Sequence, residues 1–340
     1  MLDAERAHDL AIQLLKANLV PAAKVNYDPS LSSRVLGHEF RNPIGLAAGF
    51  DKSAEVYNSI FKVGFGFVEV GTVTPLKQYG NPKPRVFRLE KDEALINRLG
   101  FNNDGSEIIR DRILSNAPSG ILGINIGPNK ETKDQKNDFL LCMKNFFDIA
   151  DYITINISSP NTEKLRDFHS DEKLISLIKS INLEKDKLKS KVPIIIKVSP
   201  DITDVSIEKI SEIIIENSIE GVIIANTSNV NRENLNDGQK FEKGGLSGKP
   251  MEIVSNKLIK KFYKFLNKNV PIIGVGGIDS GKSAYEKILS GASLVQLYTG
   301  MVYKGPEVVK KIKKEFIEQL KNDGVKNFTE IIGQKASSKF

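Results

Sequence analysis

The residues best suited to chemistry in this chain are four asparagines, Asn97, Asn156, Asn161 and Asn226. An asparagine side chain offers both a hydrogen-bond donor and an acceptor, which suits a small heterocycle with alternating N–H and C=O edges. Any one of them alone is typical of a turn or a helix cap. Four that converge on one face indicate a binding site, and Lys52 is a nearby cation for a carboxylate on the same ligand.

A glycine-rich turn and a second lysine indicate an anionic ligand. Gly274-Val275-Gly276-Gly277 precedes Ser280-Gly281 and a predicted helix, so exposed backbone N–H groups and a helix N-terminus there favour a phosphate. The glycines are also compatible with a tight turn that binds nothing. Lys197 ends an apolar run, where it suits a structural ion pair, a Schiff-base nucleophile or an electrostatic partner for an anionic cofactor ring.

Eight short apolar runs rich in β-branched residues must position these groups, and stretches of helical periodicity separate them. The runs are residues 43–48, 67–73, 121–126, 152–157, 193–198, 221–225, 271–275 and 294–298. Such runs are typical of strands buried on both faces, as in a parallel sheet. The count of eight, without a G-x-G-x-x-G turn after the first run, predicts a (β/α)8 TIM barrel rather than an open doubly wound sheet.

In such a barrel the active site lies at the carboxyl ends of the strands, and polar residues and glycines concentrate there in this sequence. They are Gly49, Asp51, Lys52, Thr72, Asn125, Asn156, Ser158, Ser159, Asn161, Lys197, Asn226, Thr227, Gly276, Gly277, Tyr298 and Thr299. Two long excursions, residues 74–103 and 229–248, follow the second and sixth runs. We expect them to be functional loops or lids.

The two ends of the chain lie outside the repeating pattern. Residues 1–20 predict an amphipathic helix with Ala7, Leu10, Ala11 and Leu14 on one face, and the last dozen residues are polar and expected to fray. The predicted organisation is an N-terminal helical extension at 1–30, a barrel at 31–330 and a polar tail at 331–340.

Composition excludes several classes of protein. The 340 residues are 40% hydrophobic and 27% charged, as in globular proteins with a sizeable core. Much of the +7 net charge comes from scattered lysines and the run 310–314, without interleaved aromatics, so we expect no nucleic-acid partner. A single cysteine, Cys142, excludes an intrachain disulfide, and three histidines without metal-ligand spacing predict no metal site. Without a signal peptide or an apolar run of ~20 residues, the chain is expected in the cytoplasm.

Six motifs together resemble the dihydroorotate dehydrogenases, in the order and spacing of that family and over nearly the whole chain. They are Ala47-Ala48-Gly49-Phe50-Asp51-Lys52, Gly71-Thr72-Val73-Thr74-Pro75, Asn97-Arg98-Leu99-Gly100-Phe101, Asn156-Ile157-Ser158-Ser159-Pro160-Asn161-Thr162, Gly244-Gly245-Leu246-Ser247-Gly248 and Gly274-Val275-Gly276-Gly277-Ile278. The resemblance implies FMN in the barrel mouth and oxidation of dihydroorotate to orotate in pyrimidine (UMP) biosynthesis.

Carried over position by position, the resemblance implies contacts for both ligands. FMN is expected to contact Ala48, Gly49, Phe50, Asp51, Lys52, Thr72, Asn125, Asn156, Lys197, Ala225, Gly248, Gly277, Tyr298 and Thr299. Substrate is expected to contact Lys52, Asn97, Arg98, Leu99, Gly100, Phe101, Asn156, Asn161, Asn226 and Thr227. Ser159 matches the catalytic base. Ala225 stands where many relatives have threonine, so a backbone contact is retained there and a hydroxyl contact is lost.

The base also indicates the subclass. Soluble class 1 relatives use cysteine, whereas the quinone-linked class 2 uses serine, and Cys142 is far from Ser159 in sequence. Glu5-Arg6-Ala7-His8 resembles the class 2 extension that forms the quinone entrance, although a helix that caps the barrel bottom is an alternative. Class 2 implies ubiquinone or menaquinone as acceptor, a monomer, and peripheral attachment through the N-terminal helix to the cytoplasmic side of the inner membrane.

The resemblance also implies a mechanism in which C6 of the substrate gives a hydride to the flavin and Ser159 takes the C5 proton. A serine hydroxyl is a poor base near neutrality, so it needs a proton relay and a dry site. The loop 161–169, with Thr162 beside the base and His169 at its end, and Phe101 above the base are the candidates. Lys197 is expected to stabilise negative charge on the flavin.

Three alternatives remain open at this point. A Schiff-base aldolase would use Lys197 as nucleophile and the glycine turn for a substrate phosphate. A non-catalytic phosphate-binding barrel at the membrane would leave Ser159 and the asparagines without a purpose. A class 1 enzyme would pass its electrons to fumarate or NAD.

Overall fold

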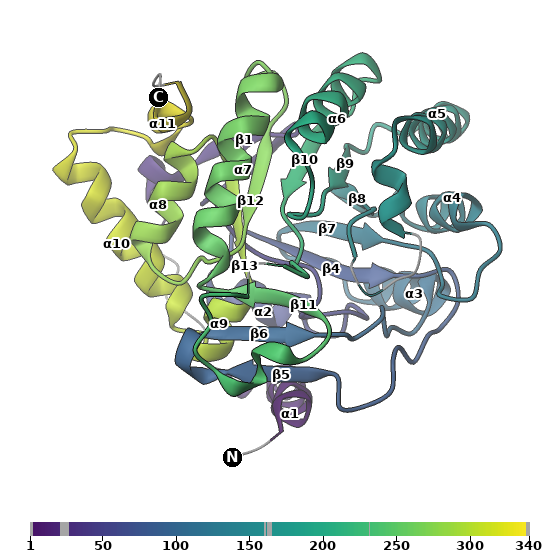
Figure 1. The fold of residues 1–340 in the computed structure, drawn as a ribbon, viewed down its shortest axis with the longest axis horizontal. Coiled ribbons are helices and arrows are strands. Elements are labelled where there is room, and N and C mark those ends of the chain that lie inside the picture. The colour runs from purple at the N-terminus through teal and green to yellow at the C-terminus, as the bar shows by residue number, and fades with distance from the viewer. Residues whose placement is uncertain (1–2, 21–26, 160, 162–164, 231, 338–340) are drawn as a thin grey trace.

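Eight parallel strands close into a barrel in the computed structural model (Figure 1). The structure describes residues 3–20, 27–159, 161, 165–230 and 232–337. The barrel strands are β3 (Ile44–Leu46), β4 (Phe67–Val73), β7 (Ile121–Ile126), β8 (Tyr152–Asn156), β9 (Ile194–Lys197), β10 (Gly221–Ile224), β12 (Ile272–Val275) and β13 (Leu294–Leu297). Each pairs with the next and β13 pairs with β3, so the predicted (β/α)8 barrel is confirmed.

The observed strands fall inside the eight apolar runs that predicted them. β4 and β7 match their runs to the residue. All seven residues of β4 are buried, because helices cover the outside of the barrel and side chains fill the inside. This double burial is the physical reason that the strands are near-continuous runs of Ile and Val.

Helices cover the outside of the barrel. They are α2 (Tyr57–Val63), α3 (Ser106–Ser115), α4 (Gln135–Phe146), α5 (Asp171–Lys187), α6 (Asp204–Glu216), α7 (Met251–Phe265), α8 (Gly281–Leu289) and α10 (Val308–Asn322). Apolar residues at helical spacing form their buried faces, as Ile312, Phe316 and Leu320 do on α10. Ser280 and Ser283 form a capping box at the start of α8.

A β-hairpin closes the amino-terminal end of the barrel. β1 (Ser33–Val35) and β2 (His38–Phe40) are antiparallel, and Leu36-Gly37 between them has φ values of 53° and 81°, as a tight two-residue turn requires. Phe40 is fully buried and meets the ring of Phe67 edge to face at 5.3 Å. This end of the barrel is therefore plugged by apolar side chains.

The two long excursions pair with each other into one small sheet. β5 (Val86–Leu89) and β6 (Ala94–Asn97) come from the first excursion and β11 (Gly245–Gly248) from the second, in the antiparallel order β11-β6-β5. The short helix η4 (Gly238–Phe241) precedes β11. We expected functional loops or lids, and these two segments form a sheet that brings Gly245 opposite Asn97.

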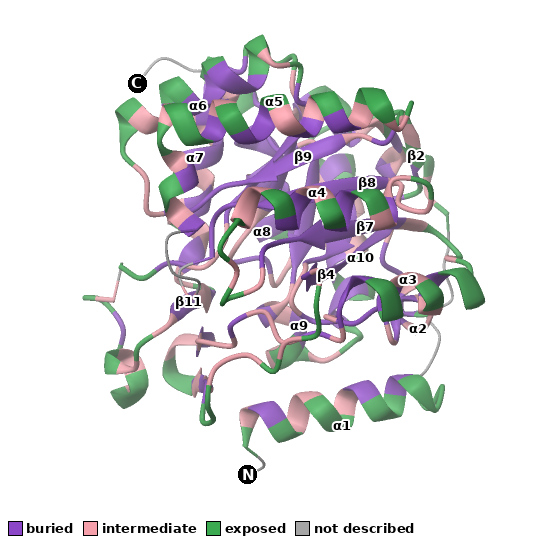
Figure 2. Cartoon of the chain, turned by 90° about the vertical axis from the view of Figure 1, so that its right-hand side faces the viewer, coloured by how far each residue is buried: buried purple, intermediate pink, exposed green. Residues whose placement is uncertain are grey.

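Helix α1 (Ala4–Lys16) packs against β5 and α2, beside the excursion sheet (Figures 1 and 2). A buried ion pair anchors it, with Arg85 Nη2 2.7 Å from Glu5 Oε1. The alternative that this helix caps the barrel bottom is wrong, because the hairpin of β1 and β2 occupies that end.

The face that α1 buries is not the apolar face predicted for it. Ile12 and Leu15 are buried, whereas Ala7 and Ala11 of the predicted face are half-buried and Leu10 and Leu14 are 48% and 39% exposed. The helix therefore packs Ile12 and Leu15 on the protein and presents Leu10 and Leu14 outward. Among the described residues, no helix is long and apolar enough to cross a membrane.

The carboxyl terminus is more ordered than its polar composition predicted. α11 (Gln334–Ser337) packs against α7 and α8, and Ala336 is buried. The backbone N–H of Gly333 donates to the carbonyl of Ile288 at 3.0 Å, which ties this segment to the end of α8. The described part of the last dozen residues therefore does not fray as expected.

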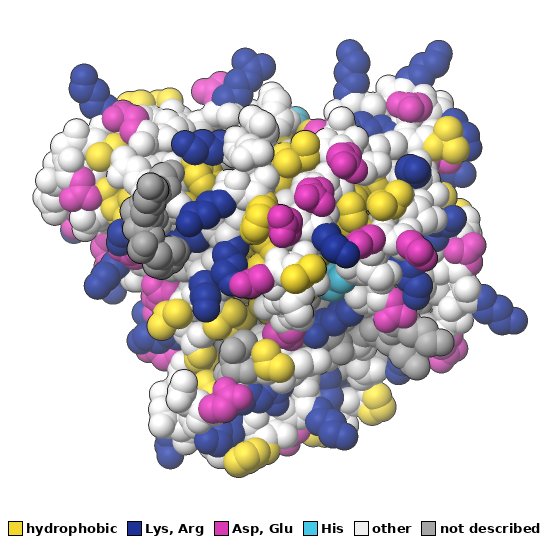
Figure 3. Space-filling view, turned by 45° about the horizontal axis from the view of Figure 1, so that its top comes forward, with side chains coloured by type: hydrophobic (Ala, Val, Ile, Leu, Met, Phe, Trp, Pro, Cys, Tyr) yellow, Lys and Arg dark blue, Asp and Glu magenta, His cyan; other side chains and the backbone are white. Residues whose placement is uncertain are grey.

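Basic residues are dispersed over the surface. On the face shown in Figure 3, Lys and Arg side chains alternate with Asp and Glu. In the run 310–314, Lys311 lies 3.7 Å from Glu315 and Lys314 lies 3.8 Å from Glu318, one helical turn away. Lys310, Lys311 and Lys314 of this run therefore lie on the solvated face of α10, whereas Ile312 between them is buried.

Candidate active site

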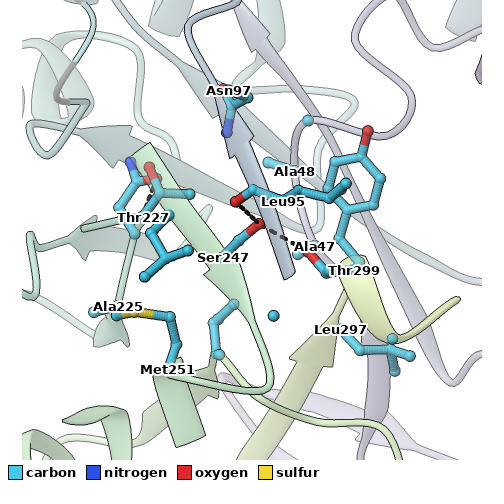
Figure 4. A pocket seen from close by; sticks show the side chains of 18 of the residues that line it. Ala47, Ala48, Leu95, Asn97, Ala225, Thr227, Ser247, Met251, Leu297 and Thr299 are labelled. Atoms are coloured by element: carbon cyan, nitrogen blue, oxygen red, sulfur yellow. Dashed lines mark hydrogen bonds between the residues drawn. The ribbon is translucent and has the colours of Figure 1, made fainter. Parts of the chain in front are cut away.

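A pocket opens at the carboxyl ends of the barrel strands. Its wall also includes β6, β11 and the short helix α9 (Thr299–Lys304) (Figure 4). The predicted site residues on this wall are Ala48, Gly49, Lys52, Thr72, Asn97, Leu99, Gly100, Phe101, Asn156, Ser159, Asn161, Lys197, Ala225, Asn226, Thr227, Gly248, Gly277, Tyr298 and Thr299. The strand ends therefore converge, and the four asparagines line one cavity.

Asn156 is the centre of a hydrogen-bond network in this pocket. Its Nδ2 donates to Thr72 Oγ1 at 2.9 Å, and its Oδ1 accepts from Ser158 Oγ at 2.9 Å and from Asn226 Nδ2 at 3.3 Å. Thr72 Oγ1 in turn donates to Asn125 Oδ1 at 2.6 Å. Because each side chain is held by others, the amides are oriented before any ligand arrives.

A buried carboxylate, Glu69, lies beneath this network inside the barrel. It accepts hydrogen bonds from Asn125 Nδ2 at 2.9 Å, Gln296 Nε2 at 3.0 Å and Tyr152 Oη at 3.1 Å. Burial lowers the pKa of Lys197, and the charge of Glu69 opposes that shift. The sequence analysis missed Glu69, although one acidic residue within an otherwise apolar strand was a usable signal.

Ser159 follows β8 and is 5% exposed on the pocket wall. The backbone N–H of Asn161 donates to Ser159 Oγ at 3.2 Å, and Asn161 Nδ2 donates to the carbonyl of Asn97 at 3.1 Å. Thr162, expected beside the base, lies outside the described residues. Burial lowers the pKa of His169 to about 4, and His169 does not line the described pocket wall.

Lys52 stands between this pocket and a second cavity, and it lines both. Burial lowers the pKa of Lys52 to about 8, and the nearby Glu5 carboxylate opposes that shift. Lys52 is therefore mostly protonated at neutral pH, and it becomes neutral when the pH rises above about 8.

The second cavity is a largely apolar groove between α1 and the barrel. Its wall includes Ala7, His8, Ala11, Ile12, Leu14, Leu15, Phe50, Leu95, Leu99, Tyr298, Met301 and Val302. The His8 ring meets Phe50 edge to face at 5.1 Å, and burial lowers the pKa of His8 to about 3, so this imidazole is neutral. Leu95, Leu99 and Tyr298 line both cavities, and the groove therefore leads from α1 to the first pocket.

Three residues expected around the cofactor do not line the pocket. Phe50 and Asp51 line the groove instead. The carboxylate of Asp51 accepts from the backbone N–H groups of Glu55 and Val56 at 2.7 and 2.8 Å, which shapes the chain before α2. Asn125 lies one layer deeper, hydrogen-bonded between Thr72 and Glu69.

Arg98, expected at the substrate, also lies off the pocket wall. Its Nη1 lies 2.8 Å from Glu242 Oε2, and its guanidinium stands 4.4 Å from the ring of Phe87. Neighbouring residues of an extended chain point to opposite sides, so Arg98 faces away from the pocket that Asn97 lines.

The excursion sheet supplies a wall residue that was not predicted. Ser247 on β11 shares a hydrogen bond with Thr299 Oγ1 at 2.9 Å and donates to the carbonyl of Leu95 at 3.4 Å (Figure 4). This contact joins the sheet to the first turn of α9. No local pattern signals it, because it depends on pairing between distant segments.

A family model described as dihydroorotate dehydrogenase matches residues 30–320. The chain belongs to the dihydroorotate dehydrogenase family. Curated relatives include the "Dihydroorotate dehydrogenase (quinone)" of Bartonella tribocorum, 46% identical over 96% of this chain and 92% of the relative. The protein of the same description from Bartonella henselae is 47% identical over 96% of this chain and 91% of its own.

Two solved structures of DHODH from Eimeria tenella are similar to this fold. The complex with ferulenol has a TM-score of 0.96 and 38% identity, covering 99% of this chain and 96% of that chain. The ligand-free form has a TM-score of 0.95 and 39% identity, covering 98% of this chain and 99% of that chain. Dihydroorotate dehydrogenases are oxidoreductases. Family membership therefore rules out the two alternative hypotheses of a Schiff-base aldolase and a non-catalytic phosphate-binding barrel.

Family membership implies a flavin cofactor, and the pocket suits one. Gly276 and Gly277 have φ values of 111° and 76°, a left-handed conformation that favours glycine. A Cβ on Gly277 would lie 2.4 Å from the Cβ of Glu252, so the turn packs closely on α7 and offers bare backbone to the pocket. The first turn of α9 adds N–H groups without partners inside the helix.

Proposed function

We propose that this chain oxidises (S)-dihydroorotate to orotate with FMN as its prosthetic group and a membrane quinone as acceptor, in de novo synthesis of UMP. The observation that carries this proposal is the convergence of Ser159 and four asparagines on a pocket that ends in the glycine turn. Serine at the base position favours the quinone-linked class, since Cys142 is buried on α4, off the described pocket wall. The names of the curated relatives, dihydroorotate dehydrogenase (quinone), support the same acceptor.

Substrate recognition rests on the asparagine amides and on Lys52. Asn156 and Asn226 are locked by Ser158, so their remaining donors and acceptors can match the N–H and C=O edges of the substrate ring without reorganisation. Lys52, protonated at neutral pH, faces the substrate carboxylate. Asn161 is held by the backbone of Asn97, which couples the loop after β8 to the excursion sheet.

Ser159 acts as the base that takes the proton from C5 of the substrate. When bound, the flavin supplies a two-electron acceptor for the hydride that leaves C6. A buried hydroxyl at 5% exposure is shielded from bulk water, which strengthens electrostatic interactions around it. Phe101 on the same wall excludes water from the base.

Lys197 carries the positive charge that stabilises negative charge on the cofactor ring. It is 5% exposed, and burial alone would favour its neutral form. The charge of Glu69 opposes this shift and so favours the charged form of Lys197 in a dry site. Hydrogen bonds from Asn125, Tyr152, Thr154 and Gln296 hold Glu69 in turn, which makes the barrel interior an electrostatic support for the pocket.

The groove between α1 and the barrel is the proposed path for ubiquinone or menaquinone. It leads toward the first pocket past Leu95 and Tyr298. Leu10 and Leu14 on the outer edge of α1 are exposed, as suits a helix in the interface plane of a membrane. We accordingly assign residues 1–30 to quinone access, 31–330 to the catalytic barrel and 331–340 to a polar tail, in a monomer bound peripherally to the cytoplasmic side of the inner membrane.

Comparing electron acceptors in one assay tests this function. Purified protein is given dihydroorotate with a short-chain ubiquinone, a menaquinone analogue, fumarate or NAD, and orotate is followed by absorbance. We expect orotate with a quinone and little with fumarate or NAD, and release of FMN on denaturation. Equal or faster turnover with fumarate or NAD would contradict the quinone assignment, and absence of flavin would contradict the whole proposal.

A further inference from the structure

One arginine, Arg166, connects three strand ends beside the pocket. Its Nε donates to the carbonyl of Ser158 at 3.3 Å, its Nη2 donates to the carbonyl of Thr227 at 3.3 Å, and its Nη1 lies 3.1 Å from Asp201 Oδ2. These three partners follow β8, β10 and β9, which are neighbouring strands of the barrel. Arg166 and Asp201 lie off the described pocket wall, so any effect on the pocket passes through the residues that they hold.

The short helix η3 (Leu165–His169) directs Arg166 toward these strand ends. A 3₁₀ helix has about three residues per turn, so Leu165 and Phe168 lie on one face of it. Both are buried, and the ring of Phe168 meets Phe139 of α4 edge to face at 6.0 Å. With that face packed on the core, Arg166 extends from a different face of η3 to the barrel strands.

Asp201 anchors the arginine. Its side chain is 10% exposed, and besides Arg166 it accepts from Ser228 Oγ and from the backbone N–H of Asn229 at 2.8 Å. A carboxylate held by three donors has little freedom to turn, and it suits the rigid fork of a guanidinium. Ser228 also pairs with Leu246 of β11 through two backbone hydrogen bonds, at 3.0 and 2.6 Å. The arginine is therefore tied to the excursion sheet as well as to the barrel.

The contact with Ser158 bears directly on the proposed base. Because a peptide group is planar, the direction of the Ser158 carbonyl sets the direction of the chain into Ser159. The Ser158 side chain is fixed as well, since its Oγ donates to Asn156 Oδ1 and accepts from Asn226 Nδ2, both at 2.9 Å. Ser158 is thus held at its side chain and at its carbonyl, and Arg166 holds the carbonyl.

We propose that Arg166 is a positioning residue that keeps Ser159 in place for proton abstraction, with Asp201 as its anchor. This inference rests on the proposed function, in which Ser159 is the base. A misplacement of about 1 Å can cost about 10²-fold in rate, so a contact on the residue next to the base matters to the reaction. Arg166 acts on the geometry of the base, because its contacts are with a carboxylate and two carbonyls of the protein.

Three variants of the full-length flavoprotein test this role. Arg166→Gln removes the guanidinium, and Asp201→Asn keeps the shape of the anchor and removes its charge. Arg110→Gln is the matched control, because Arg110 has the same 27% side-chain exposure as Arg166 and pairs with a carboxylate, Asp148, off the described pocket wall. Stopped-flow absorbance follows flavin reduction by dihydroorotate, and a titration followed by the flavin spectrum gives the dissociation constant of orotate.

For Arg166→Gln we expect flavin reduction to slow about 10–10²-fold and the dissociation constant of orotate to change less than about threefold, because the asparagines keep their other contacts. Asp201→Asn should slow reduction about fivefold, since it weakens one charged contact of Arg166. Arg110→Gln should change the rate less than about twofold, as for a partly exposed ion pair. An unchanged rate in Arg166→Gln, or an equal loss of rate and of orotate affinity, would overturn the proposal. If Arg166→Gln does not fold, Asp201→Asn decides by the same two measurements.

The same substitution in a Ser159→Ala background tests whether the effect passes through the base. Once the hydroxyl is gone, Arg166→Gln should slow the remaining reduction less than about twofold, because two changes to one chain of contacts are not additive. A full additional loss in the double variant would overturn the positioning role, since it would show an effect that does not depend on Ser159.

These results are distinguishable from failure of the proposed function. Undiminished reduction in Ser159→Ala alone would refute the assignment of the base. Slow reduction in Ser159→Ala together with undiminished reduction in Arg166→Gln would refute only the positioning role.

Discussion

At the amino-terminal end of the barrel, Phe40, Phe67 and Tyr152 pack into an apolar plug together with the starts of the other strands. At the carboxyl end, the same strands finish in residues such as Thr72 and Asn156, whose amides and hydroxyls face a pocket. The amino-terminal end is filled by apolar side chains that pack on one another, and the carboxyl end retains hydrogen-bonding groups for a ligand. The difference teaches that each strand carries two roles, stability at its start and chemistry at its end.

Removing the proposed base should have the largest effect on catalysis at the carboxyl end of the barrel, with little effect on stability. We expect Ser159→Ala to keep its flavin and to slow flavin reduction by dihydroorotate about 10²–10⁴-fold, the usual contribution of a positioned base. The free energy of unfolding should change by less than about 1 kcal/mol, because no large apolar group is lost. Stopped-flow absorbance measures the reduction. Ser158→Ala is the control, since it removes a hydrogen bond to Asn156 instead of the base. Undiminished reduction in Ser159→Ala would end the assignment.

The opposite outcome is expected at the plugged end. Phe40→Ala should lower the free energy of unfolding by about 3–5 kcal/mol, because it leaves a cavity among Phe67 and its neighbours. Urea unfolding measures the change, and flavin reduction in the folded fraction should stay close to that of the parent. Phe241→Ala removes the same ring from a site where it is 83% exposed and should have little effect. Equal destabilisation by both substitutions would show that the plug has no special role.

Titration of Lys52 sharpens the electrostatic side of the comparison. With its pKa lowered to about 8 by burial, Lys52 is charged at pH 7 and mostly neutral at pH 9. We expect the KM for dihydroorotate to rise about tenfold over that interval, because the anionic substrate loses its cation as pH rises through the pKa. Lys52→Gln should have a high KM that is flat over the same range. A rise of equal size in that variant would assign the titration to another group.

The smallest effect is expected at Arg98, which contacts Glu242 instead of the pocket. Arg98→Ala should change the KM for dihydroorotate by less than about twofold and stability by less than about 1 kcal/mol, as for a partly exposed ion pair. Asn97→Ala, one residue away on the pocket wall, should raise the KM about tenfold. Steady-state kinetics compare the two. If Arg98→Ala raises the KM as much as Asn97→Ala does, the side chain of Arg98 does not point away from the pocket as proposed.

The barrel was predictable because its signal is local. A strand buried on both faces must be apolar at every position, so the Ile and Val runs identify β7, β8 and β9 without knowledge of their neighbours. The hairpin of β1 and β2 was missed because three-residue strands are too short to show a period. The sheet of β5, β6 and β11 was missed because its pairing joins residues 94–97 to 245–248, which no local pattern encodes.

The candidate site likewise has features that the local sequence predicted and features that it did not. The glycines at 276 and 277 were readable as residue types suited to an anion, whereas the role of Ser159 as base was implied by the family resemblance. The sequence did not predict that Asn97 would meet Asn161, that Arg98 would turn to Glu242, or that Glu69 would support the pocket from below. Those contacts join segments that are far apart in the chain, and only closure of the barrel sets the distances between them.

By itself, then, the sequence determined the barrel, its ligand-facing end and the chemical types placed there, because periodicity and residue type are properties of short segments. The tertiary structure decided which of those groups touch. It laid α1 along the groove and tied Arg166 to the ends of three strands, contacts that depend on how distant surfaces pack.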